Sequence, residues 1–115
     1  MSSLVKVRQI NLEQGSPTVE QALRNMINHL GTCKRQGLKG VILIHGYGSS
    51  GTGGKIRPAV RAKLKERSLS GIVRQFCGGE EWIDKKKEML AVCSQLKDYE
   101  TTIAGNPGVT IVILR

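Results

Sequence analysis

The stretch that decides the fold is VILIHGYGSSGTGGKIRPAV, residues 41–60 of a 115-residue chain. It opens with four apolar residues between Gly40 and His45, a pattern typical of a strand buried on both faces. A glycine-rich segment follows, and beyond it apolar residues recur at helical spacing, at Ile56, Ala59, Val60 and Leu64. The stretch therefore predicts a buried strand, a glycine-rich loop at 45–54 and an amphipathic helix.

The flanking sequence alternates in the same way between strand and helix patterns. Residues 4–12 predict a strand, and Ser16 as N-cap with Pro17 as first helical residue predicts a helix whose apolar stripe continues to Leu30. After the quoted stretch we expect a strand at 72–77, a helix at 80–99, a loop at 101–108 and a strand at 109–114. This order, without repeats or a linker, predicts one α/β domain built as a two-layer sandwich.

Composition and charge narrow the classes of function. The chain has 18 Lys and Arg against nine Asp and Glu, a net charge of +9, and the whole basic excess lies in residues 1–74. Such an excess of positive charge favours a polyanionic partner, with nucleic acid as the first candidate, and a basic protein-interaction module stays open as an alternative.

No apolar run approaches the ~20 residues of a membrane helix. The N-terminus lacks the apolar core of a secretory signal, and the three cysteines form no CxxC pair. We therefore expect a cytoplasmic protein with reduced thiols and no membrane partner.

Three known sequence motifs partly match the glycine-rich loop, and none of them matches fully. Gly46, Gly48 and Gly51 fit the dinucleotide pattern GxGxxG, but no acidic residue ends the next expected strand. The P-loop pattern fails because GSSGTGGK is one residue too long and Ile56 stands where Ser or Thr would hold magnesium. The lipase-like HGYG has no GxSxG partner. We therefore expect no small-molecule cofactor.

A general phosphate site is the remaining interpretation. Glycines let backbone N–H groups converge, and the positive end of the helix that begins near Lys55 points to the same place. His45 ends the buried strand at the mouth of the loop, where an imidazole can act as acid or base. Arg57, Arg61 and Lys65 share one stripe of the helix and are expected to contact successive phosphates. The expected nucleic-acid-binding residues are Gly46, Tyr47, Gly48, Gly51, Thr52, Gly53, Gly54, Lys55, Arg57, Arg61 and Lys65.

Together these motifs resemble the Smr domain, the small MutS-related family, over roughly residues 8–115. The family motif HGxGTGxLR is matched, with a longer loop, by His45, Gly46, Gly48, Gly51, Thr52, Gly53, Ile56 and Arg57. The closing GxTxVxL is matched by Gly108, Thr110, Val112 and Leu114. The resemblance implies a two-layer βαβαββ sandwich with a four-stranded mixed sheet, similar to the C-terminal domain of bacterial translation initiation factor three. It also implies a free-standing bacterial protein that binds DNA or RNA, with 80–100 as a helical insertion in a single domain spanning 1–115.

One departure from the family pattern concerns catalysis. Nuclease members, which nick DNA or cut RNA, usually carry LDLHG at the end of the first strand, where this chain has INLEQG at residues 10–15. An amide cannot act as a base, so Glu13 is the carboxylate left to act beside His45. Three hypotheses stay open. The first is an endonuclease with catalytic His45 and Glu13, using Mg²⁺ or Mn²⁺ if it depends on a metal. The others are a DNA- or RNA-binding module without catalysis and a basic protein-interaction module. No metal-ligating residues are predicted.

Overall fold

The structure is a computed structural model that describes residues 5–46 and 53–115. These residues form one sheet of four strands: β1 (Val7–Asn11), β2 (Gly40–Ile44), β3 (Val73–Gly78) and β4 (Val109–Leu114). The strand order across the sheet is β1-β2-β4-β3. β1 runs parallel to β2, whereas β4 runs antiparallel to both of its neighbours. The predicted α/β fold with a four-stranded mixed sheet is therefore confirmed.

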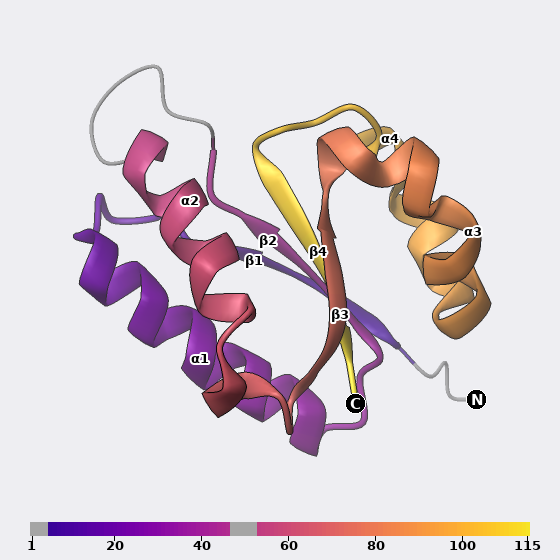
Figure 1. Ribbon diagram of the computed structural model, residues 1–115, viewed down its shortest axis with the longest axis horizontal. Coiled ribbons are helices and arrows are strands. Elements are labelled where there is room, and N and C mark those ends of the chain that lie inside the picture. Colours follow the sequence, from indigo (N-terminus) through magenta and orange to yellow (C-terminus); the bar gives the residue numbers. More distant parts are fainter. Residues whose placement is uncertain (1–4, 47–52) are drawn as a thin grey trace.

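Helices cover both faces of this sheet (Figure 1). α1 (Val19–Arg35) and α2 (Gly53–Leu64) lie on one face, and α3 (Trp82–Val92) and α4 (Glu100–Ile103) lie on the other. Each face has its own apolar core, the first centred on residues such as Met26 and Val60 and the second on Trp82 and Met89. β4 is buried along its whole length because it contributes to both cores. Among the described residues, no helix is long and apolar enough to cross a bilayer.

The start of α1 differs from the prediction, and Ser16 was wrong as the N-cap. Ser16 has a φ of +49°, a left-handed conformation, and the helix is capped two residues later by Thr18. The Thr18 hydroxyl accepts a hydrogen bond from the Gln21 N–H at 3.1 Å, and the Gln21 side chain accepts one from the Thr18 N–H at 3.0 Å. This reciprocal capping box satisfies two backbone donors, where a single serine would satisfy one.

The segment after β3 is also more broken than the predicted helix at 80–99 and loop at 101–108. A single 3₁₀ turn, Gly79–Glu81, leads into α3, which ends at Val92. Cys93 then leaves the helical region with φ −138° and ψ 88°, and a 3₁₀ segment, Ser94–Tyr99, runs into α4. The physical reason is burial, because the turns bring Cys93, Leu96 and Ile103 into the second core, which a straight helix could not do. The hydrophobic period alone predicts one helix at 80–99 because it does not show where these buried residues pack.

Candidate nucleic-acid interface

The candidate site lies where β2 ends, held between the end of β1 and the beginning of β4. The backbone N–H groups of His45 and Gly46 both donate to the Gly108 carbonyl, at 3.0 and 2.9 Å. Gly46 has a φ of +70°, and a Cβ atom built on it would overlap the carboxylate of Glu13. Glycine is favoured at this position because its backbone is left-handed, and the Glu13 carboxylate occupies the space that glycine leaves free. The structure thus places the exposed Glu13 side chain against Gly46, the residue that follows His45.

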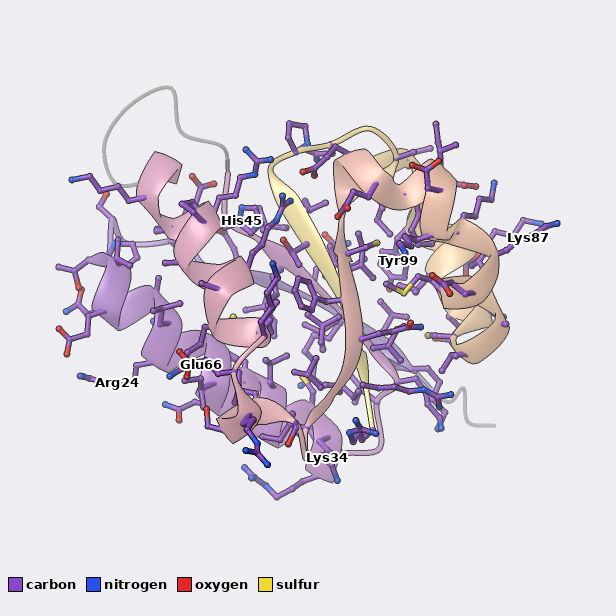
Figure 2. The ribbon with its side chains drawn as sticks, in the orientation of Figure 1. Arg24, Lys34, His45, Glu66, Lys87 and Tyr99 are labelled. Atoms are coloured by element: carbon purple, nitrogen blue, oxygen red, sulfur yellow. The ribbon has the colours of Figure 1, made fainter. Side chains whose placement is uncertain are left out.

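The His45 side chain is fully buried, with 0% of its surface exposed, and both of its ring nitrogens are occupied. Nδ1 lies 2.7 Å from the Gly46 carbonyl oxygen, and Nε2 lies 2.7 Å from the Thr110 hydroxyl. A carbonyl oxygen can only accept, so we assign the proton to Nδ1, which leaves Nε2 to accept from Thr110. Burial lowers the pKa of His45 from its usual 6.5, and the charges of Arg61 and Arg57 lower it further. Figure 2 shows the ring between α2 and β4.

Two arginines from successive turns of α2 converge on one carboxylate. Arg57 Nη2 lies 2.8 Å from Glu80 Oε2, while Arg61 binds both oxygens of Glu80, Nη1 at 2.6 Å and Nη2 at 2.9 Å. These hydrogen bonds, that of Arg61 above all, lower the pKa of Glu80 to about 2. The side chains keep access to solvent, with exposed fractions of 34% for Arg57, 19% for Arg61 and 34% for Glu80. An anionic ligand can therefore reach the same guanidinium groups.

Thr110 connects the arginines to the histidine. Its hydroxyl accepts a hydrogen bond from Arg61 Nε at 3.2 Å and donates its own proton to His45 Nε2. The resulting chain runs from Glu80 through Arg61, Thr110 and His45 to the backbone of Gly46. It fixes one rotamer of Arg61 and one orientation of the imidazole just after the end of β2. The network can orient an anion-binding guanidinium, and it leaves no free nitrogen on His45 for proton transfer.

The Arg57 guanidinium has donor capacity that Glu80 does not use. Its Nε atom is buried and has no hydrogen-bond acceptor among the described residues. A buried donor without an acceptor is unfavourable by about 1–3 kcal/mol, so a shift of the Arg57 side chain that brings this donor to an oxygen acceptor would be stabilising. This arrangement is suited to a group with several anionic oxygens, such as a phosphodiester.

The remaining predicted residues fall into two sets. Gly54 and Lys55 lie in the first turn of α2 and are exposed, and Lys65 follows the last residue of that helix. Gly53 begins α2, whereas Tyr47, Gly48, Gly51 and Thr52 lie outside the described residues. The roles predicted for these residues stay predictions.

Sequence reasoning missed two members of the site, Thr110 and Glu80. Thr110 had a signal, because it is the one polar residue in the apolar strand VTIVIL and a buried hydroxyl needs a partner. Glu80 had none. Its partners Arg61 and Arg57 are 19 and 23 residues away, so no local pattern links them.

The described side chains do not assemble a metal site. Within residues 5–46 and 53–115, no group of three or more His, Cys, Asp or Glu side chains is placed to hold a metal ion. The Glu13 carboxylate lies beside Gly46. A role for Mg²⁺ or Mn²⁺ stays a prediction, and no chemical step is assigned to a metal.

The fold and the site together define an α/β domain with a pair of arginines on the helix that follows the glycine-rich segment of the sequence. The sequence profile of the Smr domain matches residues 14–115, so the chain belongs to the Smr domain family, as its motifs predicted. The chain is similar to the Smr domain of Thermus thermophilus MutS2, whose crystal structure superposes with a TM-score of 0.58 at 25% sequence identity. That match covers 94% of this chain and 98% of the MutS2 domain. No curated protein sequence matches the chain significantly.

Proposed function

We propose that this protein binds nucleic acid through the sugar–phosphate backbone, with Arg57 and Arg61 as the central contacts. The observation that carries the proposal is the convergence of both guanidinium groups on the single carboxylate of Glu80. A phosphodiester offers the same negative charge and two oxygens at similar spacing, which is the geometry that guanidinium groups bind best. In this proposal Glu80 occupies the arginines until a phosphate group displaces it.

The surroundings of the arginine pair support the same function. The first turn of α2 contains no acidic residue and carries the exposed Lys55, so the positive end of the helix is not neutralised there. The net charge of +9 gives long-range attraction to a polyanion. Nucleic-acid binding is also what the resemblance to Smr domains implies.

The buried state of His45 favours binding over cleavage as the main function. A general base must reach the proton that it removes, yet both nitrogens of His45 are occupied by Gly46 and Thr110 inside the protein. His45 therefore acts in this proposal as a positioning residue. It holds the backbone of Gly46 and, through Thr110, the orientation of Arg61.

Hydrolysis of the phosphodiester is the second candidate, and the position of Glu13 favours it. The exposed Glu13 carboxylate lies against Gly46, at the entrance to the predicted phosphate loop. There it would take a proton from water as the water oxygen forms a bond to phosphorus. The P–O bond to the leaving sugar oxygen then breaks, and solvent protonates that oxygen. Arg57 and Arg61 would stabilise the added negative charge.

Binding is tested by comparing two double variants that remove the same charge. Arg57→Ala/Arg61→Ala changes the site, whereas Lys85→Ala/Lys87→Ala changes α3 on the opposite face, where Lys87 points away from the domain (Figure 2). Fluorescence anisotropy with labelled single-stranded and duplex DNA and RNA is measured at several salt concentrations. The arginine variant should lose about tenfold or more in affinity, and its salt slope should fall by about 2. Equal losses in both variants, or no binding by the wild type, would refute the proposal.

Cleavage is tested on the same oligonucleotides, labelled at one end, with Mg²⁺, with Mn²⁺ and with EDTA. If Glu13 is the base, Glu13→Gln should lower the cleavage rate by about 10²-fold or more and leave binding nearly unchanged. Cleavage that persists equally in Glu13→Gln and His45→Ala points to a contaminating nuclease. Uncut substrate under all conditions rejects the second candidate.

A further inference from the structure

A groove extends from the arginine pair along the side of α2 toward β3. It consists of three adjoining hollows, and each shares residues with the next. The first is lined by Gly54, Arg57, Pro58 and Arg61. The second shares Arg61 with it and shares Lys65 and Phe76 with the third. We call this surface the α2–β3 groove, and its continuity means that a ligand longer than one phosphate group can follow it.

Phe76 reaches the groove because β3 contains a bulge. Val73 pairs with Leu114 while Gln75 pairs with Ile113, so Arg74 is an extra residue in this edge strand. In a regular strand, residues 73 and 76 would point to opposite faces of the sheet. The bulge places both on the face covered by α1 and α2, where Val73 is buried and Phe76 is partly buried. One aromatic side chain is thereby presented at the junction of two hollows.

The rim of the groove is basic, and its acidic residues already have partners. Lys65, Arg67 and Arg74 are exposed, and none of them has an ion pair with a carboxylate among the described residues. Glu66 accepts hydrogen bonds from Lys63 and Ser68, and Glu80 is held by the two arginines. Glu81, which also lines the second hollow, accepts a hydrogen bond from the Gly78 N–H. The groove thus combines free positive charge along its edge with an aromatic ring between its walls.

We infer that the α2–β3 groove binds a single-stranded stretch of DNA or RNA, with one base stacked on Phe76 and with phosphates at Lys65, Arg67 and Arg74. The inference rests on the proposed function, because it continues the backbone that Arg57 and Arg61 hold. The Phe76 ring is the reason that we infer a single-stranded ligand. In a duplex each base is stacked on its neighbours, so only an unpaired base can offer its face to an aromatic side chain. A stacking contact is also tolerant of sequence, since every base has such a face.

The test uses a labelled oligonucleotide of about 12 nucleotides, single-stranded or paired, in DNA and RNA forms. An abasic position is moved along the single strand, and affinity is measured for the wild type and for Phe76→Leu, which keeps apolar bulk on the core side. The wild type should bind the single strand more tightly than the duplex and should lose about fivefold to tenfold at one abasic position. Phe76→Leu should be insensitive to that same abasic position.

Two surface variants separate this inference from the proposed function. Arg67→Ala/Arg74→Ala should weaken single-strand binding by about tenfold and should affect the duplex less, while Lys85→Ala/Lys87→Ala serves as the control of equal charge. If only the Arg57/Arg61 variant loses affinity, or the wild type prefers the duplex, the groove inference is overturned and the proposed function stands. If the wild type binds no oligonucleotide, both fall. The abasic scan of the wild type and the surface pair remain decisive even if Phe76→Leu does not fold.

Discussion

Replacing Glu80 by glutamine removes the negative charge that both site arginines hold and keeps the size of the side chain. In the free protein, Arg57 donates one hydrogen bond and Arg61 two to this carboxylate, at 2.6–2.9 Å. A phosphate group has to compete with these contacts. The Glu80→Gln variant should therefore bind nucleic acid more tightly than the wild type, while its folded state becomes less stable.

The magnitude follows from the strength with which the arginines hold Glu80. Its pKa is lowered from 4.5 to about 2, a shift that would correspond to roughly 3 kcal/mol for a fully buried group at about 1.4 kcal/mol per unit. Because about a third of the side chain is exposed, solvent screening reduces this to about 1 kcal/mol. We expect that loss in the free energy of unfolding. A gain of about fivefold in affinity, with a salt slope steeper by about 1, should accompany it.

The assay is anisotropy titration of wild type and Glu80→Gln over a series of salt concentrations, with urea unfolding for stability. Glu88→Gln is the matched control, because it makes the same charge change on α3, where Glu88 contacts Lys85 at 3.6 Å. The control should gain little in affinity. Weaker binding by Glu80→Gln would refute the reasoning, since it would mean that Glu80 positions the arginines for the ligand and does not compete with it.

Three further predictions concern stability, measured by urea unfolding with tryptophan fluorescence. The pKa of His45 is lowered in the folded state, so the unfolded chain takes up a proton first as pH falls below 6.5. The free energy of unfolding should therefore decline by up to about 1.4 kcal/mol per pH unit. His45→Asn should lack this part of the decline, and an equal slope in both proteins would argue against a buried neutral imidazole. Gly46→Ala and Gly15→Ala should each be destabilising by about 1 kcal/mol, because both glycines have positive φ and the exposed Glu13 carboxylate can move away from a Cβ at position 46. A clearly larger loss for Gly46→Ala would mean that the Glu13 side chain is held in place. The stability difference between wild type and Glu80→Gln should be complete above pH 4.5 and disappear as pH falls toward 2. The reason is that Glu80, whose pKa is lowered, stabilises the fold only while its carboxylate is ionised. A stability difference that persists in acid would instead be due to packing.

The strands and α2 were predictable because local patterns specify them. The apolar runs at 41–44 and 109–114 became β2 and β4, and the helical spacing after the glycine-rich loop became α2. The beginning of α1 and the breaks after Val92 were not predictable in the same way. They depend on a side-chain capping box and on where buried residues meet the second core.

The candidate site was predictable in position and less so in chemistry. The place of His45 at the end of β2 and the shared stripe of Arg57 and Arg61 follow from the sequence. The burial of His45 does not, because it depends on Thr110, 65 residues further along the chain. The hydrogen bonds from both arginines to Glu80 likewise depend on the turn between β3 and α3. No local sequence pattern specifies the position of that turn.

The strand order has a consequence for how the domain folds. β4 is the last element of the domain in chain order, yet it lies between β2 and β3, which have no direct pairing with each other. During synthesis only the β1–β2 pair can form early, and β3 leaves the ribosome with both edges open. The two cores must close in one late event when β4 is inserted, since that strand contributes side chains to each. Folding should therefore be slow for a domain of this length, with its longest exposure to aggregation just before the final strand is made.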